Sequence, residues 1–172
     1  MAWLMSALIV TAEFGRTDFA WLDGLRRAHY PPERNRVPAH LTLFHALPPS
    51  AVDSARRQLA LASSAPPPRA MIAGLMKLGG GVAFRVVSED LDAIRADIAD
   101  HFHGMLGAQD AQGWRPHVTI QNKASAEEAR TLFATLDRDF EPRALEIAAL
   151  ALHRYVAGPW ETVGRYPFRG AA

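Results

Sequence analysis

The feature that most constrains the fold of this sequence is an order of segments that occurs once in each half. Apolar and amphipathic segments alternate as strand, helix, strand, helix and strand, and the same order returns after three glycines at 79–81. Such a repeat predicts two similar lobes about a pseudo-twofold axis. One constant shift along the chain relates the two copies, because it carries His40 onto His117, Val10 onto Val87 and Ala70 onto Ile147.

The ends of these segments follow from capping residues, prolines and glycines. We expect strands over residues 3–12, 40–47, 70–77, 81–87, 117–122, 145–156 and 161–168. The helices between them are expected to begin at Thr17 or Asp18, at Ser50 with Asp53, at Ser88, and at a capping box of Ser125 and Glu128. The alternation predicts an α+β or α/β structure with helices outside a sheet.

Composition narrows the class of protein. The chain has 172 residues, 49% hydrophobic and 22% charged, which fits one folded domain and excludes disordered and coiled-coil classes. A net charge of +1 is too small for a protein that coats nucleic acid, and the lack of cysteine excludes thiolate metal sites. The apolar start lacks a basic segment, and no run reaches the roughly 18 residues of a membrane span. We therefore expect a cytoplasmic protein that does not contact membranes.

Two short motifs carry the strongest chemical signal. His40-Leu41-Thr42-Leu43 and the segment 117–120, with sequence HVTI, each place histidine and threonine two residues apart within an apolar strand. Since side chains alternate along a strand, each histidine lies on the same face as its threonine. Two such strands, one from each lobe, are expected to direct two imidazoles and two hydroxyls into a shared cleft.

This set of groups suits phosphoester chemistry without a metal. A neutral imidazole can take a proton and a protonated one can give it, while hydroxyls donate to phosphate oxygens. Two other interpretations stay open. The histidines can be half-buried strand residues, or the cleft can bind RNA without turnover. A metal-dependent hydrolase is disfavoured, because no carboxylates stand at ligand spacing around either motif.

Both motifs, together with the tail LHRYVAGPWETVGRYPF, resemble the two-histidine (2H) phosphoesterase superfamily in its 2′-5′ RNA ligase-like and RNA 2′,3′-cyclic phosphodiesterase branch. The resemblance covers essentially the whole chain. It implies an α+β bilobal fold, in which two pseudo-symmetric lobes of antiparallel sheet with outer helices flank a central cleft. It also implies that His40, Thr42, His117 and Thr119 are catalytic.

The resemblance further implies the ligands. The substrates would be RNA ends or small cyclic nucleotides, opened to a 2′-phosphate, and 2′-5′ linkages, cleaved or formed. No cofactor or metal is expected, and the protein is expected to be a monomer. The residues after the second motif, at 121–123, depart from the basic or aromatic residues common in relatives, which leaves the substrate open.

Other residues near the motifs are candidates for substrate binding. Those that share a strand face with the motifs or flank them are Phe44, Gln121, Arg34, Arg36, Arg115 and Lys123. The alternative for Phe44 and Gln121 is packing or exposure at the end of a strand. The alternative for the charged residues is a solvated position in a loop. Trp114, Tyr30 and Phe14 can stack a base or belong to the core.

The remaining histidines and glycines give weaker signals. His101 and His103 are two residues apart on a helix, a spacing that does not suit a zinc site. Strict alternation directs His45 away from the cleft. His153 lies in no motif, and the glycines at 79–81 match no phosphate-binding loop, so they are expected to form a turn.

Overall fold

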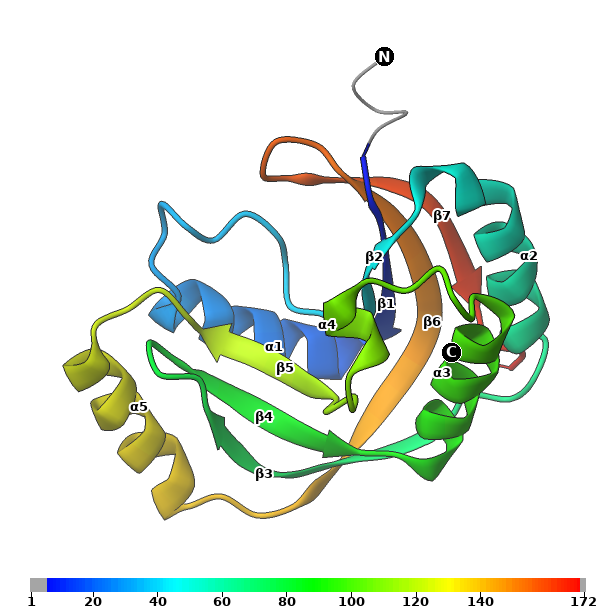
Figure 1. The fold of residues 1–172 in the computed structure, drawn as a ribbon. Coiled ribbons are helices and arrows are strands. Elements are labelled where there is room, and N and C mark those ends of the chain that lie inside the picture. The colour runs from blue at the N-terminus through cyan, green and yellow to red at the C-terminus, as the bar shows by residue number, and fades with distance from the viewer. Residues whose placement is uncertain (1–5, 171–172) are drawn as a thin grey trace.

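The computed structural model of the chain describes residues 6–170. Seven antiparallel strands form one sheet in the order β1-β2-β5-β4-β3-β6-β7, and β1 also pairs with β6, so that six strands close into a ring (Figure 1). The strands are β1 (Leu8–Phe14), β2 (Leu41–Leu47), β3 (Arg69–Lys77), β4 (Val82–Val87), β5 (His117–Gln121), β6 (Arg143–Tyr155) and β7 (Trp160–Pro167). The α+β fold with antiparallel sheet and outer helices is confirmed.

Helices lie around this ring, with α2 and α3 on one side and α5 on the other (Figure 1). They are α1 (Arg16–His29), α2 (Val52–Ala62), α3 (Glu89–His101), the short α4 (Ala108–Ala111) and α5 (Ala126–Arg138). A 3-10 turn over Pro49–Ala51 precedes α2. The segment with α4 was not expected from the sequence pattern.

The ring keeps its strand order when the two halves are exchanged, β1 with β4, β2 with β5 and β3 with β6. The shift that carries His40 onto His117 holds at the two places where equivalent strands meet. It relates Leu41 to its partner Val118, and it relates Arg69 to its partner Glu146.

The first strand of each half follows a different, shorter shift. Ala12 pairs with Leu41, and Phe84 pairs with Val118, so the shift that relates β1 to β4 carries Ala12 onto Phe84. The expected match of Val10 with Val87 is therefore wrong. The segment between β4 and β5 contains α4 and is longer than its counterpart, which explains the difference.

The third strand of each half pairs across to the other half. β3 pairs with β4 and β6, and β6 pairs with β1 and β3 as well as with β7. Helix α1 likewise packs on β5 of the second half more than on β1. The two halves of the sequence are thus interleaved in space, and the core between sheet and helices needs both.

The helix starts test the capping predictions. The Ser88 side chain accepts from the Leu91 amide, and the capping box of Ser125 and Glu128 is present, so these two starts are confirmed. The starts at Thr17 or Asp18 and at Ser50 are wrong, because α1 begins after Gly15 and α2 after Ala51.

Asp18 is used elsewhere. Its carboxylate accepts from the Glu146 amide at 2.8 Å and from the Arg143 guanidinium at 3.1 Å, which ties α1 to β6. In the first strand, β1 begins at Leu8, and the part of the expected strand at residues 3–5 lies outside the described residues. The glycines at 79–81 form the turn between β3 and β4 as expected, with φ 74° at Gly79.

Candidate active site

Strands β2 and β5 meet at one register pair, Leu41 with Val118, and both of these side chains are fully buried. Continuing this antiparallel register by one residue on each side sets His40 opposite Thr119 and Thr42 opposite His117. Residues opposite each other lie on the same face, so the structure brings the four motif side chains together. All four are half-buried, so solvent reaches them.

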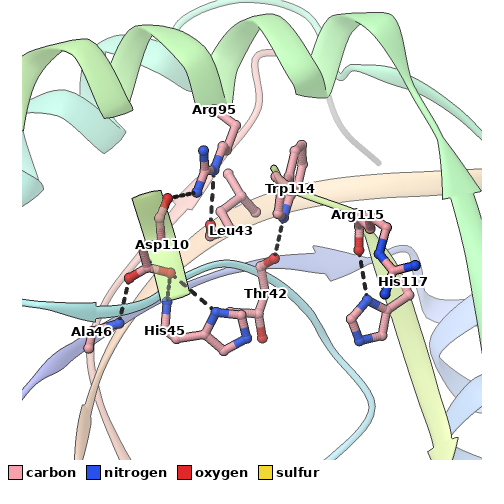
Figure 2. A network of polar contacts seen from close by, with 9 residues as sticks. All are labelled: Thr42, Leu43, His45, Ala46, Arg95, Asp110, Trp114, Arg115 and His117. Atoms are coloured by element: carbon pink, nitrogen blue, oxygen red, sulfur yellow. Dashed lines mark hydrogen bonds and ion pairs between the residues drawn. The ribbon is translucent and has the colours of Figure 1, made fainter. Parts of the chain in front are cut away.

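The two histidine rings are held in the same way. His40 Nδ1 lies 2.8 Å from the Pro38 carbonyl oxygen, and His117 Nδ1 lies 2.7 Å from the Arg115 carbonyl oxygen (Figure 2 shows the latter). A carbonyl can only accept, so Nδ1 carries the hydrogen in both rings. In a neutral ring Nε2 is then the nitrogen left to accept a proton. The shift that relates the two motifs relates the two carbonyls as well.

Burial lowers the pKa of His40 from its ordinary 6.5 to about 4. The hydrogen bond to Pro38 opposes this effect, while the charges of Arg26, His153 and His117 add to it. His40 is therefore neutral near pH 7, the form that can accept a proton. Arg26 is 4% exposed, so the charge that acts on the His40 ring is a buried one.

Side chains from other elements fix the backbone of both motifs. Trp114 Nε1 donates to the Thr42 carbonyl at 3.0 Å, and Arg26 donates to the Thr119 carbonyl at 3.0 Å (Figure 2 shows the former). A sheet would normally bind these carbonyls through strand pairing, but β2 and β5 share a single pair. Arg26 also donates to Asn35 at 2.8 Å, which ties the loop before β2 to β5.

A network centred on Asp110 holds the segment with α4 against β2 (Figure 2). The Asp110 carboxylate accepts from the amides of His45 and Ala46 at 2.8 and 2.9 Å and lies 3.2 Å from His45 Nδ1. Arg95 donates to the carbonyls of Asp110 and Leu43. Burial would raise the pKa of Asp110, but the bonds from His45 and Ala46 outweigh it and hold the pKa below its ordinary value.

The four charged residues predicted to bind substrate do not all lie in the cavity beside His40. Arg36 lies beside His40 in one cavity, and Arg34 is exposed in the same loop. Arg115 has an exposed side chain, while its carbonyl orients His117. Lys123 is exposed in the turn after β5, with φ 62°.

Phe44 and Gln121 are buried, with 0% and 4% of their surface exposed, so packing is the interpretation that the structure favours for both. Register irregularities between β1 and β2 explain Phe44, because strict alternation fails after Thr42 and both following residues face the core. The Arg95 guanidinium covers the Phe44 ring at 4.5 Å.

The three aromatic candidates also have partners within the protein. Trp114 is bonded to β2, Tyr30 lies under the Arg26 guanidinium at 4.3 Å, and Phe14 is 7% exposed at the edge of the core. His45 is hydrogen-bonded, and His101 Nε2 lies 2.6 Å from Ser54 Oγ.

Sequence reasoning missed three residues that stand close to the histidine pair: Arg26, His153 and Trp160. Arg26 stands four residues after Leu22 on the buried face of α1. A charged residue at a buried helix position is uncommon, and this feature of the sequence could have indicated a role for Arg26. His153 and Trp160 approach His40 through the pairing of β6 with β1 and β7, which no local pattern encodes.

Among the described residues, no three histidine, cysteine, aspartate or glutamate side chains gather closely enough to hold a metal ion. Within the same part of the chain, no helix is long and apolar enough to cross a membrane.

Comparison with known proteins identifies the family. The family model of the 2′-5′ RNA ligase superfamily matches residues 15–159, which include both motifs. The chain belongs to the 2′-5′ RNA ligase superfamily. The resemblance drawn from the two motifs is therefore confirmed, and with it membership in a superfamily of phosphoesterases and ligases.

Solved structures agree with this superfamily fold. TT0787 of Thermus thermophilus matches with a TM-score of 0.63 and 18% identity, over 96% of this chain and 100% of that one. E. coli LigT, solved in complex with 3′-AMP, matches with a TM-score of 0.56 and 16% identity, over 95% of this chain and 98% of that one. At these identities the likeness establishes the fold alone. No curated protein sequence matches.

Proposed function

We propose that this chain is a metal-independent phosphodiesterase that opens 2′,3′-cyclic phosphates, at RNA ends or in small nucleotides, to 2′-phosphates. One observation carries the proposal: the matched setting of two imidazoles across the single β2–β5 pair, each with Nδ1 bound to the carbonyl two residues earlier. Both Nε2 atoms are thereby available for proton exchange with a substrate. Membership in the superfamily supports the reaction class.

The reaction needs one proton taken and one proton given. A water oxygen forms the new bond to phosphorus, the bond from phosphorus to ribose O3′ breaks, and a proton ends on O3′. One histidine takes the proton of the water and the other supplies the proton of the leaving oxygen. The hydroxyls of Thr42 and Thr119 donate to the non-bridging oxygens, where negative charge builds.

The surroundings of His40 support a division of these roles. Its pKa of about 4 keeps the ring neutral near pH 7, which suits a base that accepts the proton of water. We therefore assign the base role to His40 and the acid role to His117.

The same groups can act on a 2′-5′ linkage. There the neighbouring ribose 3′ hydroxyl replaces water as the attacking group, and the 5′ oxygen of the next residue leaves with a proton. The reverse of this step forms the linkage without a nucleotide cofactor, because a catalyst lowers the barrier in both directions. The solved complex of E. coli LigT with 3′-AMP supports nucleotides as the ligand class.

The test is incubation with RNA ending in a 2′,3′-cyclic phosphate, in EDTA, for the wild type, His40→Ala and His117→Ala. We expect a 2′-phosphate end from the wild type and a loss of about 10²- to 10⁴-fold in each variant. His103→Ala is the matched control, because His103 is exposed after α3 and outside the motifs.

Turnover that needs a metal, or that survives in both motif variants, would overturn the proposal. Wild-type protein that binds the RNA without changing its end would replace the enzyme by a non-catalytic RNA-binding protein of the same fold.

A further inference from the structure

A cavity of about 410 Å³ opens beside His40, on the side where β1, β6 and β7 pair. Its volume falls within the roughly 300–1,000 Å³ of small-molecule sites. The loop between α1 and β2 and the β6–β7 hairpin both contribute residues to its wall, and both lie toward the upper left in Figure 1. His40 is a member of the wall, so a ligand that fills the cavity contacts one histidine of the pair.

The cavity has a polar floor. His153, which is 8% exposed, stands between two threonine hydroxyls, with Nε2 3.0 Å from Thr11 Oγ1 and Nδ1 3.1 Å from Thr162 Oγ1. Burial lowers the pKa of His153, and a neutral imidazole offers one donor and one acceptor. One threonine therefore accepts from the ring and keeps its own hydrogen for another partner. Thr11 is also the register partner of Thr42, so the floor adjoins the first motif.

The wall is aromatic next to His40. The half-buried Trp160 ring lies 4.7 Å from the His40 ring, inclined at 63°, and 5.2 Å from the His153 ring, inclined at 37°. Phe14 and the partly exposed Phe19 add apolar surface. Flat aromatic surfaces of this kind suit a nucleobase, because any base can stack on an aromatic ring through its π-face.

The rim carries an excess of positive charge. Arg165 is paired with Glu13 at 2.5 Å, while Arg16 and Arg36 form no ion pair within the described residues. The Arg36 guanidinium lies next to Gly158 at the tip of the β6–β7 hairpin. A β-carbon placed on this glycine would be 3.8 Å from Arg36 Nη1. Guanidinium groups bind phosphate oxygens through paired hydrogen bonds. The rim therefore suits a second phosphate, in addition to the cyclic phosphate that the proposed function places at His40.

We propose that this cavity binds the base and the 5′-phosphate of the nucleotide whose 2′,3′-cyclic phosphate lies at the histidine pair. The inference rests on the proposed function and narrows its substrate class. The enzyme selects cyclic phosphates on nucleotides that also carry a 5′-phosphoryl group, through Trp160 and Arg36, over nucleosides that carry a cyclic phosphate alone.

The first experiment compares kcat/KM for three substrates. These are a nucleoside 2′,3′-cyclic phosphate, the same compound with a 5′-phosphate, and a dinucleotide ending in a cyclic phosphate. We expect the 5′-phosphorylated compounds to be preferred by about tenfold or more, as for one charge-assisted contact. The second and third substrates distinguish a free phosphate from the phosphodiester of an RNA chain.

Arg36→Gln should reduce this preference to within about twofold of unity, because it removes the charge that faces the 5′-phosphate. Arg130→Gln is the matched control, since Arg130 is exposed on α5 away from the cavity, and it should keep the preference. Equal rates with and without the 5′-phosphate in the wild type would overturn the inference and leave the proposed function intact.

Binding is measured separately by calorimetry with a nucleoside 5′-monophosphate, which offers no cyclic phosphate. We expect binding that survives in His117→Ala and weakens at least about tenfold in Trp160→Leu, while Trp160→Phe retains part of it. Unchanged thermal unfolding of the variants shows that they fold. Binding that depends on Trp160 without any hydrolysis would overturn the proposed function and support the cavity. A wild type that does not bind the monophosphate, or a Trp160→Leu that binds it as tightly, would overturn the cavity proposal.

Discussion

The two motif histidines have matching backbones and different neighbours. Arg85 is the register partner of His117, whereas the shorter shift that relates β1 to β4 sets Glu13 at the equivalent place beside His40. Of the two motif histidines, His40 is the one whose ring has Trp160 beside it. A symmetric pair of imidazoles thus stands in an asymmetric environment, which is what a division into acid and base requires.

The first prediction concerns the charge of His40. NMR titration of its imidazole should give a midpoint near pH 4 in place of 6.5, because burial and nearby charges oppose protonation. The unfolded chain keeps the ordinary pKa, so it binds the proton first. The contribution of His40 to the free energy of unfolding is therefore complete above about pH 6.5 and is lost as the pH falls toward 4. A midpoint at the ordinary value would contradict the base assignment drawn from it.

A second prediction separates the acid from the base. A substrate with sulfur in place of the 3′ oxygen has a leaving group that departs without a proton. We expect this substrate to restore most of the activity lost in His117→Ala and little of that lost in His40→Ala. The measurement is the ratio of rates for the sulfur and oxygen substrates in each variant. Rescue of His40→Ala instead would reverse the assignment.

At the scale of residues, the sequence predicted those site residues that belong to a short motif present in both halves. The motif pairs could be found because histidine and threonine recur two residues apart in both halves. Arg26 and His153 could not be found in this way, because their contacts join residues 93 and 142 positions apart.

At the scale of elements, strand β2, which carries Thr42 of the first motif, depends on a segment that the repeat did not predict. The α4 segment is tied to β2 through Asp110, whose carboxylate satisfies two amides at the irregular part of the strand. Strands and capping boxes follow from local patterns, and most were predicted within a few residues. The bulges in β2 do not follow from such patterns, and they explain why Phe44 is buried.

A third prediction tests this tie. Asp110→Ala should lower the free energy of unfolding by about 2–4 kcal/mol, because it leaves the His45 and Ala46 amides without their buried acceptor. Urea denaturation measures the change. Asp139→Ala, at an exposed site after α5, is the control and should change the free energy by less than about 0.5 kcal/mol. A loss for Asp110→Ala no larger than for the control would show that α4 is held by packing alone.

At the scale of the whole molecule, the repeat predicted two equivalent halves but not how they combine. The local pattern of apolar and polar residues predicts that a segment is a strand, but it does not predict which strand it pairs with. In the ring, β3 leaves its own half to pair with β4 and β6, and β6 pairs with β1. Pairing at such sequence separations is decided by closure of the sheet and the shared core, which only the assembled chain supplies.

The fourth prediction follows from this interleaving. If the chain is divided in the turn after Gly79, the first fragment keeps only the β1–β2 pair, and its third strand has no partner. We expect neither fragment alone to give a cooperative thermal transition, because each exposes unpaired strand edges and half of a core. Equimolar fragments should restore the transition and the proposed cyclic phosphodiesterase activity, since the histidines come from different fragments. Circular dichroism and the RNA assay measure both. A first fragment that unfolds cooperatively by itself would mean that each half folds around its own core and that strand exchange adds little.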